Sequence, residues 1–454
     1  MGLLQDQRKP LGPQIAANRT HTVVEICNMY PTTVYDMKDK KQHLKIPPDI
    51  EDIILPRKTL SVMEFLQFPL PGVSITREPA TMTYHPETFF SRLAPTITDP
   101  QVIRRTLLPP LDVLKSLLQG SHPFQVATQS IICQHMPGIP EHQRFPMWIL
   151  AYWTRVAEAL PLKRRWSLAE EALMNQKMNP RCTRETTSLI NQVYAELADI
   201  LWSGSIQGFS CAPPIDVLAS YLTDDWLTDE HENQMMYLLD RELARHGQGE
   251  GVHIPLTYIV TQLHNVYHHP NRDEHYATAK KNRWLRQKGQ ELGTGVCEKI
   301  PLIINLCQNH WVSVIIDATS SKILYGDSFG HPIPQNLVDT LTWWTYQHTR
   351  TVFHIDTLAI TRQEDGHNCG MLAWNAIAAH FLPEEYSLMD SRTIADDRLR
   401  IFLRVVERHN EKVKKACSTI QSSSLKSKYQ PVISSRGSRI QVYLPKATER
   451  ANGL

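Results

Sequence analysis

The sequence has few cysteines, and none of them forms the paired motif of a structural metal site. Eight cysteines are spread over 454 residues, and no two are spaced as Cys-x-x-Cys. This spacing gives no support for a zinc ribbon or a thioredoxin-like redox motif. A chain of this length can bury an adequate core without disulfides, so we expect the cysteines to be mostly reduced.

Long apolar runs and a strong net charge are also missing. No uninterrupted apolar run is long enough to span a bilayer, and the N-terminal stretch MGLLQDQRKPLGPQ lacks the apolar segment of a secretory signal. The formal net charge is only +2, so charge gives no reason to expect a nucleic-acid partner. We therefore expect an intracellular protein of the nucleus, the cytoplasm or both, with no membrane partner.

Four stretches of the chain differ in composition. Residues 1–140 are an N-terminal region in which many prolines interrupt every helical pattern. Residues 141–211 carry large apolar residues at helical spacing and predict two helices packed together. Residues 212–415 alternate between helix and strand patterns, and we expect a fragment with these bounds to fold and act alone. Residues 416–454 are Ser-rich and basic, which predicts a mostly disordered tail.

The apolar pattern of residues 300–326 predicts strands that end in polar, titratable residues. The segment IPLIINLCQNHWVSVIID reads as two strands around a turn at Gln308-Asn309, and His310 and Trp311 open the second strand. The segment KILYGDSFG predicts a third strand with Asp327 at its end. A helix in PQNLVDTLTWWTYQH and a strand in VFHIDTLAI follow.

The segment CGMLAWNAIAAHFL predicts a helix that begins at Cys369. Unpaired N–H groups at a helix start stabilise a thiolate, and a neighbouring imidazolium stabilises it further. We therefore expect His310 to lie over Cys369, with Asp327 orienting the imidazole ring. Gln363, six positions before the cysteine, could donate to an oxyanion together with the Cys369 backbone N–H.

The order of these motifs resembles the Ulp1/SENP cysteine proteases, which belong to the clan of the adenovirus protease. The resemblance rests on His310-Trp311, on Asp327-Ser328 and on the pattern Gln-x-x-Gly-x-x-Cys-Gly over residues 363–370. The stretch Trp226-Leu227-Thr228-Asp229 is similar to a Trp-Leu-x-Asp motif of the family. The family prefers Asp before the nucleophile, where this sequence has Asn368. The resemblance covers residues 213–410, and its second half is the more specific.

The resemblance implies the fold, the activity and the site. The expected domain is α+β, of the papain-like or adenain-like type, with a central mixed sheet and a nucleophile-bearing helix, preceded by a mainly helical region. Cys369 would be the nucleophile, His310 the base, Asp327 the orienting acid and Gln363 the oxyanion donor. Trp311 would wall a narrow tunnel for a Gly-Gly tail, which suits glycine because only glycine passes between close aromatic walls.

The resemblance also implies a partner and leaves two other functions open. Trp226 and Asp229 would contact a ubiquitin-like protein of the SUMO or NEDD8 type, cleaved after its C-terminal glycine with no metal or organic cofactor. One alternative is a non-catalytic module that binds such a protein, although such a module need not keep all four catalytic residue types. The other is an acyltransferase of the same clan, although no basic cluster near the site suggests its phosphorylated activator.

Overall fold

The N-terminal part of the molecule is built from short helices and a small sheet. The computed structural model describes residues 45–73, 89–120, 129–132 and 143–427. Prolines that interrupt the helical pattern of this region also begin helices, because proline is tolerated in the first turn; Pro48 and Pro100 do so here. The elements are α2 (Pro48–Ile54), α3 (Val62–Gln67), α4 (Pro100–Arg105), α5 (Leu111–Gly120) and an antiparallel sheet β1 (Phe90–Ser91), β2 (Ser130–Ile131), β3 (Phe145–Pro146).

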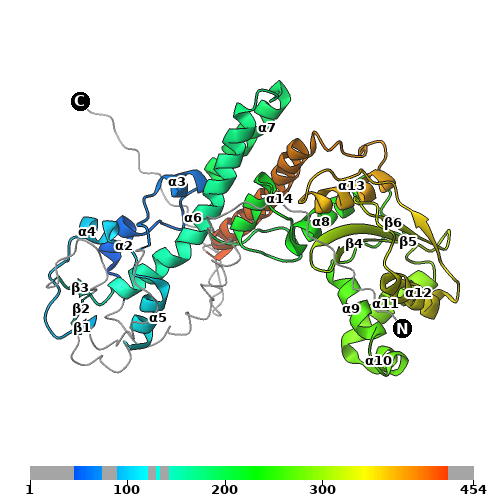
Figure 1. Cartoon of the computed structure of the whole chain (residues 1–454), viewed down its shortest axis with the longest axis horizontal. Coiled ribbons are helices and arrows are strands. Elements are labelled where there is room, and N and C mark those ends of the chain that lie inside the picture. Colours follow the sequence, from blue (N-terminus) through cyan, green and yellow to red (C-terminus); the bar gives the residue numbers. More distant parts are fainter. Residues whose placement is uncertain (1–44, 74–88, 121–128, 133–142, 428–454) are drawn as a thin grey trace, which may run out of the picture.

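The next region, where the sequence predicts helices, contains two longer helices. Helix α6 spans Ile149–Met178, and α7 spans Arg184–Asp199. The first half of α6 packs in one apolar core with α2, α4, α5 and the small sheet, and its second half packs in another. Pro161 lies inside the helix, close to where its contacts pass from the first core to the second. Figure 1 shows α6 running from the N-terminal helices toward α14.

The remaining chain is a mixed sheet covered by helices on both faces. The strands are β4 (Lys299–Leu306), β5 (His310–Asp317), β6 (Lys322–Gly326) and β7 (His354–Thr357), in that order across the sheet. The first two pairings are antiparallel and the pairing of β6 with β7 is parallel. The helices are η4 (Ile215–Leu222), α8 (Asp229–Arg245), α9 (Tyr258–Tyr267), α10 (Arg272–Thr278), η5 (Lys280–Asn282), α11 (Arg283–Gly293), α12 (Gln335–Thr349), α13 (Cys369–Phe381) and α14 (Ile394–Ser427). The α+β prediction with a central mixed sheet is confirmed.

The sheet separates two apolar layers because successive strand residues point to opposite faces. Along β5, Trp311 and Ile315 belong to the core that contains α8, α13 and α14. Val312 and Val314 belong to the core formed with α9, α11 and α12. Figure 1 places α13 and α12 on opposite sides of the strands accordingly. Helix α13 is thereby held against β5, which brings its first residue close to the start of that strand.

The N-terminal helices share a core with the sheet-bearing region. Trp166 of α6 and Ile190 of α7 lie in the same buried cluster as residues of η4, α8, α13 and α14. The Arg165 guanidinium also bonds the carboxylate of Asp216, which is buried in η4. The predicted boundary at residue 212 therefore falls between elements that pack against each other. This changes the expectation that residues 212–415 fold alone.

The C-terminal boundary predicted at residue 416 falls inside a helix. Helix α14 continues to Ser427, and the rest of the predicted tail, residues 428–454, lies outside the described residues. A first-turn pair of acids, Asp396 and Asp397, suits the N-terminal end of this helix. Among the described residues, no helix is long and apolar enough to cross a membrane.

We expect a fragment of residues 212–415 to aggregate or to melt without cooperativity, whereas residues 45–427 should melt cooperatively. The shorter fragment lacks α6 and α7 and would expose the apolar surface that Trp166 and Ile190 cover. Circular dichroism melting and gel filtration of both fragments measure the difference. Equal melting temperatures for the two fragments would show that the shared core is dispensable.

Candidate active site

His310 and Asp327 meet at one end of the sheet, as predicted. Strand β5 begins at His310, and its antiparallel neighbour β6 ends one residue before Asp327, so both side chains lie at the same edge. His310 Nε2 lies 2.9 Å from Asp327 Oδ1. The Phe329 backbone N–H donates to the same oxygen at 2.7 Å, and the Tyr325 hydroxyl donates to Oδ2 at 3.3 Å. The buried carboxylate is thus fixed in place.

The other ring nitrogen of His310 is free to act on a neighbour. His310 Nδ1 is buried and has no hydrogen-bond partner among the described residues. The ring of Phe329 stacks on the imidazole with centroids 4.7 Å apart and planes 26° from parallel. One nitrogen is therefore held by Asp327 and one face is covered by Phe329, which leaves Nδ1 as the atom that can exchange a proton. Phe329 could not be predicted as part of the site, because an aromatic residue in a turn carries no local signal of stacking.

Cys369 begins α13, as predicted, and is buried against the start of β5. Only 2% of the residue is exposed. Burial raises the pKa of its thiol, and the nearby Glu232 adds to this rise. The backbone N–H groups of Trp311, Gly370 and Cys369 itself act in the opposite direction by favouring the thiolate. Burial and Glu232 therefore favour the protonated thiol, whereas the three N–H groups favour the thiolate.

Gln363 lies in the loop before α13 and is tied to the turn after Asp327. Its backbone N–H donates to the Ser328 carbonyl oxygen at 2.9 Å, and the Ser328 hydroxyl donates to its side-chain Oε1 at 2.8 Å. Its Nε2 donates to Asp365 at 3.1 Å. An amide nitrogen carries two hydrogens, so one donor remains for an oxyanion. The oxyanion role stays a prediction, and these contacts show how the side chain is oriented.

Asn368, the residue before Cys369, is held by a buried arginine that no local pattern in the sequence indicates. Arg398 of α14 is 3% exposed and donates from Nη1 to Asn368 Oδ1 at 2.9 Å. Its Nη2 donates to the Asp225 carbonyl oxygen at 2.8 Å. The side-chain amide of Asn368 donates in turn to Asp365 at 2.8 Å. Asn368, the departure from the family pattern, thus joins Arg398 to the loop before Cys369.

Asp365 organises that loop by accepting several hydrogen bonds. Burial alone would raise the pKa of its carboxyl, but N–H donors of His367 and Asn368 together hold it below the usual range. The two backbone bonds are each 2.9 Å long. An ionised Asp365 therefore caps the turn that leads into α13.

The three residues predicted to bind substrate have different surroundings. Trp226 is 46% exposed in the segment before α8, and Asp229 is the exposed first residue of that helix. Trp311 is only 2% exposed, and its indole N–H donates to the Leu227 carbonyl oxygen at 2.8 Å. Little of the Trp311 ring is open to line a tunnel in this structure. All three roles stay predictions.

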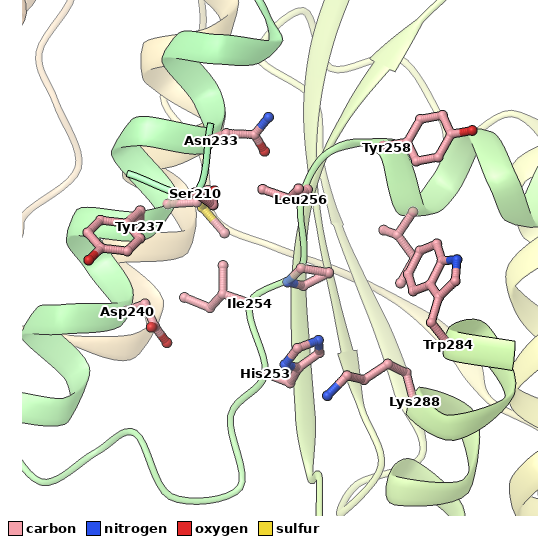
Figure 2. Close-up of a pocket in the computed structure, with 13 residues that line it drawn as sticks. Ser210, Asn233, Tyr237, Asp240, His253, Ile254, Leu256, Tyr258, Trp284 and Lys288 are labelled. Atoms are coloured by element: carbon pink, nitrogen blue, oxygen red, sulfur yellow. The ribbon is translucent and has the colours of Figure 1, made fainter. Parts of the chain in front are cut away.

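Two hollows lie beside α8. A groove of about 730 Å³ is lined by Asp229 and by the turn that contains Cys307 and Gln308, just before His310. A second, more apolar pocket of about 530 Å³ lies between α8, the segment 253–256 and α11 (Figure 2). Asp240 and Lys288 line this pocket from α8 and α11. Of the predicted site residues, only Asp229 lines the groove, and none lines the pocket of Figure 2. Among the described residues, no group of three His, Cys, Asp or Glu side chains is placed to hold a metal ion.

Comparison with known proteins matches part of the chain to one family and finds similar solved structures. No curated protein sequence matches the chain. The structure of the SUMO protease Ulp1 with its catalytic cysteine oxidised to a sulfinic acid is 19% identical and covers 48% of this chain and 94% of its own, with a TM-score of 0.37. The C-terminal Ulp1 protease domain in complex with Smt3, the yeast ortholog of SUMO, is 18% identical and covers 48% and 93%, also with a TM-score of 0.37. The Xanthomonas campestris effector XopD bound to ubiquitin is 22% identical and covers 39% and 90%, with a TM-score of 0.27.

The family match agrees with the motif-based prediction, which placed the resemblance at residues 213–410. Residues 225–418 match the family described as Ulp1 protease family, C-terminal catalytic domain. This range contains β4 to β7 together with α8 to α13 and most of α14. Residues 225–418 are therefore a domain of the Ulp1 protease family, which is a family of cysteine peptidases and hence of hydrolases.

Proposed function

We propose that this chain cleaves the peptide or isopeptide bond after the C-terminal glycine of a ubiquitin-like protein, of the SUMO or NEDD8 type. The reaction would process precursors, release conjugates or do both, inside the cell in the nucleus or the cytoplasm. The observation that carries the proposal is the arrangement of His310. Nε2 is held by Asp327, and the buried Nδ1 has no hydrogen-bond partner in the described part of the chain; Cys369 begins the helix that packs against the same strand.

The proposed reaction proceeds through a thioester. His310 Nδ1 accepts the proton of the Cys369 thiol, and the thiolate attacks the glycine carbonyl carbon. His310 then gives this proton to the leaving amine as the C–N bond breaks. Water attacks the thioester with His310 as base, which releases the glycine carboxylate and restores the thiol. Asp327 stabilises the imidazolium that forms in both steps.

Gln363 is proposed to stabilise the oxyanion formed in both attacks. The side-chain oxygen of Gln363, Oε1, accepts a hydrogen bond from the Ser328 hydroxyl. A flip of the side-chain amide would break this bond, so the orientation of Nε2 is fixed. The second hydrogen on Nε2 is available beside the first turn of α13. The backbone N–H of Cys369 supplies a second donor.

The proposed surface for the ubiquitin-like protein lies at the start of α8. The exposed Trp226 ring offers apolar contact area, and Asp229 lines the neighbouring groove. A partly exposed tryptophan is the residue type that most often dominates a protein interface.

We expect Cys369→Ala to abolish covalent capture by a ubiquitin-like protein that carries a thiol-reactive C-terminus, because the attacking sulfur is gone. Reversible binding should persist, since the substitution leaves the Trp226 surface unchanged. Mass spectrometry of the adduct and a binding assay measure the two effects. Cys211→Ala is the matched control, because this free cysteine lies outside the site. Capture by the Cys369→Ala variant would mean that the nucleophile is misassigned, and reversible binding without capture by the wild type would indicate a binding module.

We expect Gln363→Ala to lower kcat by about 10² to 10³ with substrate affinity nearly unchanged, because an oxyanion exists only along the reaction path. Gln363→Glu should be at least as damaging, since a carboxylate repels the developing charge. Steady-state kinetics on a fluorogenic ubiquitin-like substrate provide kcat and KM. Glu364→Ala, an exposed neighbour in the same loop, should change neither. An unchanged kcat in Gln363→Ala would leave the backbone N–H groups as the sole oxyanion donors.

We expect Trp226→Ala to weaken binding of the ubiquitin-like protein by roughly tenfold or more, with the reactivity of Cys369 toward small alkylating agents unchanged. The loss follows from removal of an exposed aromatic contact. Trp284→Ala is the matched control, because Trp284 is 38% exposed but lines the pocket of Figure 2. Equal affinity of the two variants would place the docking surface elsewhere.

A further inference from the structure

Helix α8 carries a carboxyl group that is buried without any hydrogen bond. Glu232 is 0% exposed, and neither Oε1 nor Oε2 has a hydrogen-bond partner among the described residues. A buried polar group without a partner is costly, and an isolated buried charge costs far more. Nothing in the packing of α8 requires an acid here, because its other inward positions include Met235, Met236 and Leu239.

The carboxyl group lies directly against the residue that follows the nucleophile. A Cβ atom at Gly370 would stand 2.1 Å from Glu232 Oε1 and 3.3 Å from Trp311 Cδ1. Because glycine has no side chain, Gly370 leaves room for the Glu232 carboxyl group. Glu232 therefore touches the first turn of α13, which is the end that stabilises negative charge and the end from which Cys369 must act.

The groups around Glu232 come from four elements and largely oppose its ionisation. Burial is the main cause that raises the pKa of its carboxyl well above the usual value, and Asp229 on the same helix adds to the rise. Arg398 on α14 acts in the opposite direction, but its guanidinium is already bonded to Asn368 and to backbone carbonyls. A negative charge on Glu232 raises the pKa of Tyr221 on η4 and the pKa of Cys369 on α13, because it repels the anion that each of these groups would form.

We infer that Glu232 and Cys369 compete for a single negative charge at the N-terminus of α13, so that the thiolate forms readily only while Glu232 carries its proton. Glu232 is thus a positioning residue that acts through Cys369 and touches no substrate. Two acids that share one site cannot both ionise at low cost, and their titrations are coupled. The inference rests on Cys369 as the nucleophile of the proposed function.

The coupling has a defined direction with pH. As pH rises, ionisation of Glu232 makes the thiolate harder to form, so thiolate formation in the wild type is displaced to higher pH. Because the native carboxyl binds its proton more tightly than an unfolded one, the native state holds more protons above the ordinary carboxyl pKa. Stability therefore falls as pH rises through that window. Replacing Glu232 by an uncharged residue should reduce this fall of stability with pH. It should also let the Cys369 thiolate form at lower pH.

The test is the rate of iodoacetamide alkylation at Cys369 as a function of pH in the full chain, with the modified residue identified by mass spectrometry. Above the pH at which Glu232 ionises in the wild type, Glu232→Gln should react on the order of tenfold faster than the wild type, with one titration step in place of two. Glu232→Met keeps the length of the side chain and removes both oxygens, and should behave as Glu232→Gln does. Glu230→Gln removes the same charge from a partly exposed position on α8 and should reproduce the wild-type profile.

The outcomes separate this inference from the proposed function. Alkylation profiles of Glu232→Gln and Glu232→Met that superimpose on the wild-type profile overturn the inference, even when the wild type captures a ubiquitin-like probe. A shifted profile in a chain that captures no such probe supports the inference about Cys369 and counts against the proposed substrate. Should Glu232→Gln not fold, the profile of Glu232→Met decides in the same way.

Discussion

The hydrogen bond between His310 and Asp327 depends on the antiparallel pairing of β5 and β6, and the rest of the site depends on that bond. The register fixes His310 at the beginning of one strand and Asp327 just past the end of the next. Asp327 is then held by Phe329 and Tyr325, so the imidazole has one orientation in which Nδ1 is free. A one-residue slip of β5 would point the histidine to the other face of the sheet.

Contacts connect the N-terminal helices to the nucleophile through α14. Gln176 of α6 and Thr186 of α7 both donate to the carboxylate of Asp396, at 3.0 Å and 2.7 Å. Two residues later in the same helix, Arg398 bonds Asn368, which precedes Cys369. The helical region therefore contacts the helix that holds the loop before Cys369. Because Arg398 is buried, removing Asn368 Oδ1 would leave one of its donors without a partner, which is costly.

The sequence predicted the helices and strands of the site well where a single hydrophobic period continued through the whole segment. The apolar runs around His310 and the helix beginning at Cys369 could be located because buried strands and helices have characteristic periods. The strand expected in VFHIDTLAI is shorter, His354–Thr357, because this edge strand pairs on one side only and its residues are exposed. The domain boundaries were harder, because composition changes at Pro213-Pro214 although the core continues across it.

The sequence by itself determined which residues are the candidates for the chemistry, because His310, Asp327, Gln363 and Cys369 occur in a recognisable order at or near the ends of predictable elements. It did not determine what surrounds them. Glu232 reads in the sequence as an ordinary helix acid, and only the approach of α8 to α13 buries its carboxyl against Gly370. That contact joins residues 138 positions apart (370 minus 232). Such contacts depend on how whole helices pack, and no local period in the sequence encodes them.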